Sequence, residues 1–273
     1  MNKIIFKHNK IYIENVLNFD LAQTLDCGQA FRWSQRDGRW CGIAGGKYIE
    51  LYRENGSIVI EGATPEDFEG FWRHYFDLER DYGAIIESVS TNDTVRAAAE
   101  FGGGIRILNQ EPWEALCSFI ISQNNNIPRI KGIIERLCEC FGEKIEGGYT
   151  FPTAQKIATL TVEDLAPLRC GFRAKYILDA ARLVSSGEII LENLKGIDFD
   201  TAQSELMRIK GVGPKVADCT LLFGLGHIEA FPKDVWIKRA LEEYFDGELP
   251  ESAREYAGIV QQYIFYYIRE NSR

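Results

Sequence analysis

The strongest structural signal in the chain is the segment 206–219, which reads Leu-Met-Arg-Ile-Lys-Gly-Val-Gly-Pro-Lys-Val-Ala-Asp-Cys. The pattern predicts a helix that ends at a tight Gly-Val-Gly hairpin, followed by a second helix with Pro214 at its first position. Gly211 and Gly213 allow the backbone to turn with a positive φ and to approach a large ligand closely, because no Cβ intervenes. The second helix offers free N–H groups and a positive dipole end to a phosphate. An ordinary helical hairpin with a glycine turn fits the same spacing.

An aspartate lies at the start of the next predicted helix. Asp234 precedes Val-Trp-Ile-Lys-Arg-Ala-Leu and is expected to cap that helix, which would fix its carboxylate at the helix mouth. Lys215, at the start of the preceding helix, would then face Asp234 across a cleft. Capping aspartates and solvated lysines are common, so a purely structural pair is the alternative.

The amino-terminal part of the chain, up to residue 62, predicts an antiparallel sheet. Short runs of alternating apolar and aromatic residues are separated by glycine-containing hairpin turns at 36–38, 44–46 and 54–56. From Thr64 the period changes from two to about 3.6, which is typical of helices. We therefore expect an α+β fold, with an antiparallel β-sheet domain and flanking helices over 1–90.

The rest of the chain, 91–273, predicts a helical region that contains the hairpin at 206–219. Helical signals begin within 1–90, with an apolar stripe just after Thr64, and continue in four later helices of 91–273. The stripe consists of Phe68, Phe71, Trp72 and Tyr75; two of the helices are opened by Pro112 and Pro128, and the other two span 173–185 and 256–269.

Composition narrows the class of protein. With 45% hydrophobic and 26% charged residues and only 8 prolines, the chain is expected to fold throughout. No apolar run approaches the roughly 20 residues of a membrane span, and charges interrupt the start too early for a secretory signal, so we expect a cytosolic protein. The seven cysteines are odd in number and scattered, which favours reduced, mostly buried thiols over a disulfide framework.

The net charge of −9 argues against non-specific attraction to nucleic acid. The charge is uneven, however, because residues 201–240 carry six basic and four acidic side chains, a local net charge of +2. The acidic body therefore leaves room for a small neutral-to-basic face.

Residues 211–219, followed by Pro-Lys-Asp-Val at 232–235, resemble the helix-hairpin-helix/Gly-Pro-Asp superfamily of DNA glycosylases, in its lysine-bearing, bifunctional branch. Three further segments, at 27–33, 122–130 and 171–176, are similar to the 8-oxoguanine DNA glycosylase family. They read Cys-Gly-Gln-Ala-Phe-Arg-Trp, Ser-Gln-Asn-Asn-Asn-Ile-Pro-Arg-Ile and Gly-Phe-Arg-Ala-Lys-Tyr. The resemblance runs in order over nearly the whole chain. It implies a TATA-binding-protein-like sheet followed by a mostly α-helical glycosylase domain, with the catalytic cleft between helical subdomains.

The resemblance implies a bifunctional DNA glycosylase and AP lyase that flips out and excises 8-oxoguanine, preferably opposite cytosine. Lys215 would attack C1′ of the damaged nucleoside and hold the sugar as a Schiff base, and β-elimination would nick the strand. The site must favour the neutral amine by burial or by helix-end charge. Asp234 would stabilise the developing oxocarbenium charge and help to move the lysine proton.

The same resemblance implies a pocket for the flipped base. The Gly28 carbonyl would accept a hydrogen bond from N7–H, a donor that 8-oxoguanine has and guanine lacks. Gln261 would bind the Watson–Crick edge, and Phe265 and Cys219 would sandwich the ring. Taken alone, these residues also fit plainer roles: a turn at Gly28, a solvated helix position at Gln261, and core packing for the other two.

For the DNA, the resemblance places Asn124 in the gap left by the flipped base and directs Arg129 and Arg173 to the orphaned cytosine. A simple turn and surface salt bridges are the alternatives. Phe172 stands where the eukaryotic pattern often has tyrosine, and Trp236 where histidine is frequent, so the wedge and phosphate contacts can differ and opposite-base selectivity can be looser. The hairpin glycines, Gly211 and Gly213, would grip the backbone. Lys233 replaces a usual small apolar residue.

No cofactor is expected, because the Cys-x6-Cys-x2-Cys-x5-Cys array of related iron-sulfur glycosylases is absent from the sequence. A loosely held monovalent cation at the backbone of Ile209 and Val212 is expected by analogy only. We expect a monomer that works on duplex DNA containing 8-oxoguanine, in the cytoplasm at the nucleoid, without a membrane.

Two other functions stay open. One is a glycosylase of the same superfamily for another oxidised or alkylated base, against which Gly28 and Gln261 argue. The other is a non-enzymatic DNA-binding helix-hairpin-helix protein. Lys215 with Asp234 argues against it, because phosphate binding requires neither residue at that spacing.

Overall fold

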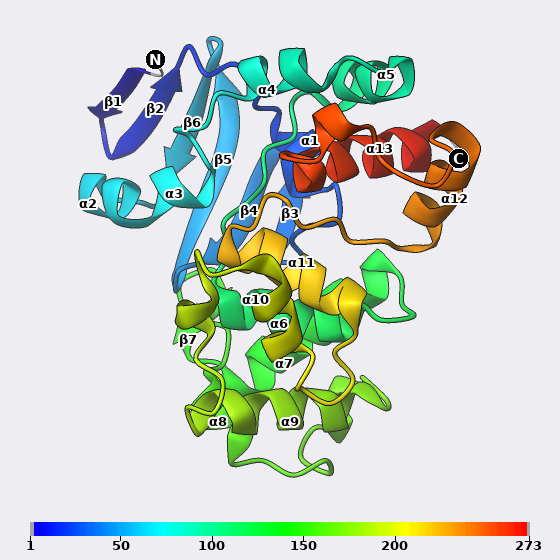
Figure 1. Ribbon diagram of the computed structural model, residues 1–273. Helices are drawn as coiled ribbons and strands as arrows, with labels where there is room; N and C mark the ends of the chain where they lie inside the picture. The colour runs from blue at the N-terminus through cyan, green and yellow to red at the C-terminus, as the bar shows by residue number, and fades with distance from the viewer. Residues whose placement is uncertain (1–2, 272–273) are drawn as a thin grey trace.

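The computed structural model describes residues 3–271, in which a six-stranded antiparallel sheet lies beside a body of helices (Figure 1). The strand order across the sheet is β1-β2-β6-β5-β4-β3. The strands are β1 (Lys3–Lys7), β2 (Lys10–Glu14), β3 (Trp33–Arg36), β4 (Arg39–Ala44), β5 (Lys47–Glu54) and β6 (Ser57–Glu61). The predicted amino-terminal sheet is therefore confirmed, and its three predicted turns join β3 to β4, β4 to β5 and β5 to β6.

The sheet buries one set of its alternating side chains. In β2, Ile11 and Ile13 are buried and pair with Ile60 and Ile58 of β6. Because successive side chains of a strand point to opposite faces, this register puts all four isoleucines into one layer of the core.

The predicted helix start at Thr64 is confirmed. Thr64 and Asp67 form a reciprocal capping box at the start of α2 (Pro65–Asp67), which continues through a π-helical segment (Phe68–Trp72) into α3 (Arg73–Tyr75). Of the predicted stripe, Phe68, Trp72 and Tyr75 are buried, whereas Phe71 is half-buried with its ring against Gly45. The π-helical turn, with its wider i→i+5 hydrogen bonding, shifts the stripe from the regular 3.6-residue period.

A short two-stranded hairpin and the remaining helices complete the described chain. The hairpin strands are β7 (Lys144–Ile145) and β8 (Gly148–Tyr149). The helices are α4 (Tyr82–Val89), α5 (Asp93–Gly102), α6 (Pro112–Ser122), α7 (Ile127–Phe141), α8 (Ala154–Ala158), α9 (Arg173–Ser185), α10 (Phe199–Leu206), α11 (Pro214–Leu225), α12 (Val235–Tyr244) and α13 (Ala257–Asn271), with α1 (Leu21–Leu25) preceding the sheet strand β3.

The predicted helix bounds agree closely with the structure. Helix α6 begins at Pro112 and α9 spans 173–185, as expected. Helix α7 begins one residue before Pro128, because the Asn126 side chain caps it through the Arg129 N–H. Helix α13 begins at Ala257 and ends at Asn271, slightly later than the predicted 256–269.

Two hydrophobic cores hold these layers together. One joins the sheet to Phe68, Trp72 and Phe76, and the other fills the helical body. They interlock, since Phe31 from the amino-terminal part belongs to the helical core and Leu108 from the helical part belongs to the sheet core. The division at residue 90 stays a prediction.

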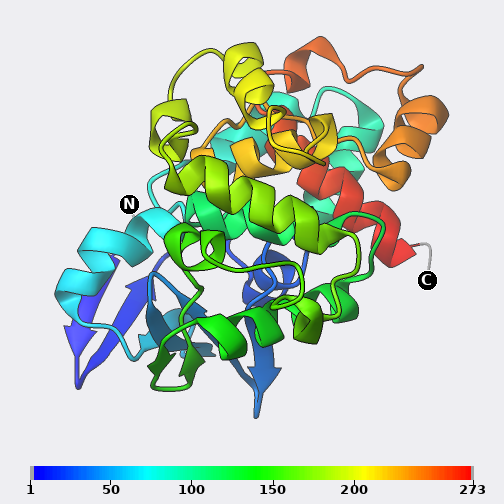
Figure 2. The ribbon, with the colours of Figure 1, turned by 90° about the horizontal axis from the view of Figure 1, so that it is seen from below.

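In both ribbon views β1 and β2 lie at the edge of the molecule far from α12 and α13 (Figures 1 and 2). Within 3–271, no helix is long and apolar enough to cross a membrane.

Candidate active site

The predicted hairpin is present between α10 and α11. Pro214 is the first residue of α11, and Gly213 precedes it as the N-cap. Gly211 has φ +83°, and a Cβ there would lie 2.4 Å from the Tyr176 ring, so only glycine fits. The expectation of a positive φ at Gly213 is wrong, because its φ is −102°. A Cβ on Gly213 would meet open space, so this glycine leaves the helix end accessible rather than permitting a turn.

Lys215 occupies the second position of α11 and is half-buried. Its Nζ lies 5.2 Å from the centroid of the Phe119 ring, which comes from α6. One turn further along α11, burial raises the pKa of the Cys219 thiol to about 11, although the positive charge of Lys215 opposes the shift. Cys219 is therefore a neutral thiol at pH 7 and packs as a small apolar group.

Asp218 is a buried carboxyl group on the same helix. Burial raises its pKa to about 6, against the opposing effects of a hydrogen bond from Gln203 and of the charges on Lys233 and Lys215. Gln203 Nε2 donates to Asp218 Oδ1 at 2.5 Å, which ties α10 to α11 behind the hairpin. The sequence analysis did not single out Asp218.

Asp234 caps α12, as the sequence predicted. Its Oδ1 accepts a hydrogen bond from the Ile237 N–H at 2.8 Å, which fixes the carboxylate at the helix start. By contrast, no side chain caps α11 among the residues that the structure describes. The N-terminus of α11 therefore keeps N–H groups available for an external anion.

A small pocket brings Lys215 and Asp234 together with the four residues assigned to base recognition. Its volume is about 50 Å³. It is lined by Gly28, Phe119, Lys215, Cys219, Phe223, Pro232, Asp234, Gln261, Gln262 and Phe265. Pockets that hold a small molecule usually measure roughly 300–1,000 Å³, so a base enters only if lining side chains move apart.

Buried hydrogen bonds hold Gly28 at this pocket. Gln29 is fully buried, and its amide donates to the carbonyls of Thr24 and Arg106 at 2.9 and 2.8 Å. Gly28 has φ +90°, a conformation that favours glycine. On the other side, Arg269 of α13 donates to the Asp26 carbonyl at 2.9 Å, so the Gly28 loop and α13 are joined across the pocket.

Four pocket residues were not predicted from the sequence. Phe119 and Phe223 stack with ring centroids 5.3 Å apart, and both lie in apolar helices where nothing distinguishes them from core. Pro232 was quoted only as part of the Pro-Lys-Asp-Val segment at 232–235, without a role of its own. Gln262 carried a usable signal, since two consecutive glutamines interrupt the apolar face of a helix.

The two arginines directed to the orphaned cytosine differ in their surroundings. Arg173 is 3% exposed, and its guanidinium donates to the carbonyls of Gln123, Asn124 and Cys170. Burial, and then the nearby Arg129, lower the pKa of Arg173. Arg129 is exposed. The surface ion-pair alternative is wrong for both, because neither side chain forms a salt bridge with any residue between 3 and 271.

Asn124 lies in the turn between α6 and α7, is exposed and has φ +47°. The Arg173 contacts fasten this turn to α9. Phe172 is 53% exposed beside it, with the Arg173 guanidinium 4.5 Å from its ring centroid. The ring centroids of Tyr176 and Phe172 are 5.7 Å apart. Tyr176 also lies against Gly211, so it links the Asn124 turn and Phe172 to the hairpin.

The other predicted DNA and ion contacts lie on the hairpin side. Trp236 is 39% exposed in the first turn of α12. The Ile209 carbonyl accepts a hydrogen bond from the Val212 N–H at 3.0 Å, and the cation expected there stays a prediction. Across residues 3–271, no three His, Cys, Asp or Glu side chains gather closely enough to hold a metal ion.

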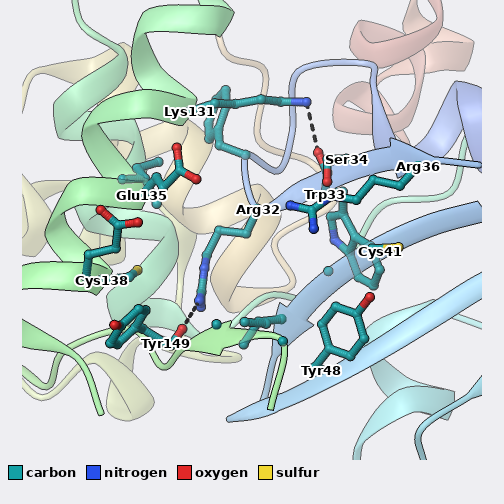
Figure 3. A pocket seen from close by; sticks show the side chains of 17 residues that line it. Arg32, Trp33, Ser34, Arg36, Cys41, Tyr48, Lys131, Glu135, Cys138 and Tyr149 are labelled. Atoms are coloured by element: carbon teal, nitrogen blue, oxygen red, sulfur yellow. Dashed lines mark hydrogen bonds between the residues drawn. The ribbon is translucent and has the colours of Figure 1, made fainter. Parts of the chain in front are cut away.

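A larger cavity of about 320 Å³ lies between β3 to β5, α7 and the β7–β8 hairpin (Figure 3). On its wall, Arg32 pairs with buried Glu114 at 3.2 Å and reaches the Tyr149 carbonyl. Lys131 donates to the Trp33 carbonyl at 3.0 Å. None of the predicted site residues lines this cavity.

Comparison with known proteins agrees with this geometry. Residues 11–116 match the model of the 8-oxoguanine DNA glycosylase N-terminal domain, and residues 117–257 match the HhH-GPD superfamily of base excision DNA repair proteins. The chain is 32% identical to the N-glycosylase/DNA lyase of Saccharomyces cerevisiae, over 86% of this chain and 70% of that protein.

Two solved structures are similar over the full length. One is MBOgg1 in complex with a low-affinity DNA ligand, with a TM-score of 0.94 and 41% identity over 100% of both chains. The other is the Clostridium acetobutylicum 8-oxoguanine glycosylase/lyase in complex with double-stranded DNA containing cytosine opposite 8-oxoG, with a TM-score of 0.92 and 39% identity over 100% of this chain and 99% of that one. The chain therefore belongs to the HhH-GPD superfamily of base excision DNA repair proteins, within its 8-oxoguanine DNA glycosylase family.

Proposed function

We propose that this protein is a bifunctional DNA glycosylase and AP lyase that excises 8-oxoguanine from duplex DNA, preferably opposite cytosine. The observation that carries the proposal is the pocket in which Lys215 and Asp234 meet Gly28, Cys219, Gln261 and Phe265. An amine, a fixed carboxylate and a set of base-reading groups in one place support glycosyl transfer better than simple DNA binding.

Lys215 is the nucleophile of the proposed reaction. Its free electron pair forms a bond to C1′ while the C1′–N9 bond breaks, and the bond electrons leave with the base, which takes up a proton. The sugar ring then opens to an iminium ion. Loss of a C2′ proton expels the 3′ phosphate, and this β-elimination nicks the strand.

Asp234 acts on the charge that develops at C1′ as the base leaves. Its cap contact with Ile237 holds the carboxylate in place before the reaction, so little reorganisation is required when positive charge appears. The same carboxylate is placed to receive a proton from the attacking amine.

Base recognition uses the opposite walls of the pocket. The Gly28 carbonyl accepts from N7–H of the lesion and repels the N7 lone pair of guanine. Gln261 binds the Watson–Crick edge. Cys219 and Phe265 pack against the two faces of the ring, and the neutral state of the Cys219 thiol suits an apolar contact.

The surrounding surface would hold the DNA. Gly211 and Gly213 bring the backbone of the hairpin to a phosphate, with a monovalent cation at the carbonyls of Ile209 and Val212. Trp236 adds a contact from α12. On the other side, Asn124 fills the gap left by the flipped base, beside Phe172, Arg129 and Arg173. We place the reaction in the cytoplasm at the nucleoid, where free cysteines stay reduced, with the protein acting as a monomer.

Borohydride trapping tests the proposal, because it reduces the Schiff base to a stable covalent link. Incubation of the wild type with an 8-oxoguanine·C duplex and borohydride should yield a protein–DNA complex that survives denaturation. Lys215→Gln should still bind the duplex but give no trapped complex. Lys233→Gln is the matched control, since this lysine is exposed and next to Asp234, and it should trap like the wild type. Trapping by Lys215→Gln would show that another amine is the nucleophile.

A further inference from the structure

Helix α13 places two consecutive glutamines at the pocket. Gln261 and Gln262 are each 4% exposed, and both line it. Removing a side-chain amide from water is unfavourable unless its donors and its acceptor find partners. The hydrogen bonds of these two amides therefore indicate what the pocket is built to hold.

One hydrogen bond joins the two glutamine side chains and leaves one carbonyl oxygen without a donor. Gln262 Nε2 donates to Gln261 Oε1 at 2.7 Å. Gln262 Oε1 is buried and has no hydrogen-bond partner anywhere in the described chain. A buried acceptor without a donor destabilises the empty protein, so it points to a ligand that brings the donor.

The Watson–Crick edge of 8-oxoguanine supplies one donor more than Gln261 can satisfy. This edge presents the O6 acceptor and two donors, N1–H and the 2-amino group. The carboxamide of Gln261 offers an NH₂ group to O6 and a carbonyl oxygen with two lone pairs. One lone pair already accepts from Gln262 Nε2, so only the other is left for N1–H. The 2-amino group then needs a further acceptor beside Gln261.

We propose that Gln262 is a specificity-determining residue whose Oε1 accepts a hydrogen bond from the 2-amino group of the flipped base, while its Nε2 orients Gln261. The inference rests on the proposed function and adds a second group of the base, besides N7–H, that the pocket recognises. Gly28 reads the oxidation at N7, and Gln262 reads the amine that separates 8-oxoguanine from oxidised purines without it.

The experiment compares two bases that differ only in this amine. Single-turnover excision of 8-oxoguanine and of 8-oxohypoxanthine, each opposite cytosine in the same duplex, is measured for the wild type, Gln262→Leu and Gln262→Glu. The wild type should prefer 8-oxoguanine by about tenfold, the effect of one buried hydrogen bond left unmade. Gln262→Leu should reduce the preference to nearly one. Gln262→Glu keeps an acceptor and should keep the preference, while slowing both bases because Gln261 loses its donor.

Gln155→Leu is the matched control, because it makes the same substitution at an exposed glutamine of α8, and thermal unfolding checks that each variant is folded. Equal wild-type rates on the two bases would overturn the inference, as would an unchanged preference in Gln262→Leu. If Gln262→Leu does not fold, loss of the preference in Gln262→Glu would overturn it. Release of neither base by the wild type would overturn the proposed function as well, so the two failures are distinguishable.

Discussion

The pocket around Lys215 and the cavity beside Arg32 differ in size and in the state of their polar groups. The cavity has a volume of about 320 Å³ and the pocket about 50 Å³. In the cavity, Arg32 is paired with Glu114, and Lys131 donates to the Trp33 carbonyl. In the pocket, Gln262 has a buried oxygen without a donor among residues 3–271.

Under the proposed function, this difference separates a structural cavity from the site of reaction. Charged groups that already pair with one another have little left to offer a ligand. Groups that stay unpaired are unfavourable in the empty protein and become favourable only when a ligand arrives. The proposed function therefore rests on the lining residues and not on the volume, and the two sites should respond differently to substitution.

The largest expected effect comes from Asp234 in the pocket. Asp234→Asn keeps a side chain that caps α12 well but removes the negative charge that the proposed reaction directs at C1′. Loss of one prearranged electrostatic partner slows such a step by about a hundredfold or more. Single-turnover excision of 8-oxoguanine opposite cytosine should fall by this factor, while the affinity for the duplex changes much less.

Asp198→Asn is the matched control for Asp234→Asn, because Asp198 caps α10 in the same way through the Thr201 N–H at 3.0 Å but does not line the pocket. It should excise the base at nearly the wild-type rate. A rate for Asp234→Asn close to wild type would mean that this carboxylate is only a cap.

Behind the cavity wall, substitution of Glu114, the buried partner of Arg32, should change stability and its pH dependence. Burial raises the pKa of Glu114 to about 7 against the attraction of Arg32, from an ordinary value of 4.5. Because the folded-state pKa is the higher one, the folded protein binds the proton more tightly, and this contribution to stability is present below pH 4.5 and lost as the pH rises through 7. Glu114→Gln does not titrate. Between pH 5 and pH 8 the wild type should therefore lose about 2 to 3 kcal/mol of unfolding free energy relative to the variant.

Urea unfolding of the wild type and Glu114→Gln at a series of pH values measures this change. Glu139→Gln is the matched control, since Glu139 lines the cavity beside Arg32 but is exposed. A constant difference in unfolding free energy between wild type and Glu114→Gln across this range would contradict the prediction. Excision by Glu114→Gln should stay near the wild-type rate, because Glu114 does not line the pocket.

Features that depend on local chain chemistry could be predicted from the sequence. Glycine at 211, proline at 214 and the capping Asp234 each act within one turn of their own segment, so the hairpin and the start of α12 followed from residue types alone. The pocket around Lys215 was predicted in a different way. Its residues come from segments far apart in the chain, and their grouping followed from a family resemblance rather than from spacing.

The parts that escaped prediction depend on tertiary packing. The π-helical turn before Arg73 and the negative φ at Gly213 carry no residue signature. Arg173 was directed to the orphaned cytosine, with a surface salt bridge as the alternative, and only the fold shows that it donates to the carbonyls of the Asn124 turn. The glutamine pair at 261–262 is visible in the sequence, but that Gln262 lines the same pocket as Lys215 follows only from the fold.

The smallest expected effect concerns cytosine preference, where Arg129 and Arg173 make unequal contributions. Four of the five guanidinium N–H groups of Arg173 are accounted for by its bonds to Cys170, Gln123 and Asn124. Arg173→Ala therefore releases the Asn124 turn and should slow excision opposite all four bases. It should also lower the preference for cytosine opposite the lesion. Arg129 is exposed and free to turn toward the orphaned base. Arg129→Ala should lower the cytosine-to-adenine rate ratio by roughly fivefold or more, about 1 kcal/mol or above, and leave excision opposite adenine nearly unchanged.

Substitution of Phe172 should raise the cytosine-to-adenine rate ratio. Its ring supplies stacking without a hydroxyl, so discrimination rests on the arginines, and Phe172→Tyr should raise the ratio by a few fold through one added hydrogen bond. Excision opposite C, A, G and T under single-turnover conditions at fixed salt measures all three variants. Arg182→Ala is the matched control, an exposed arginine on the same helix as Arg173. An unchanged cytosine-to-adenine ratio in both Arg129→Ala and Arg173→Ala would show that Arg173 only fastens the Asn124 turn and that neither arginine reads the opposite base.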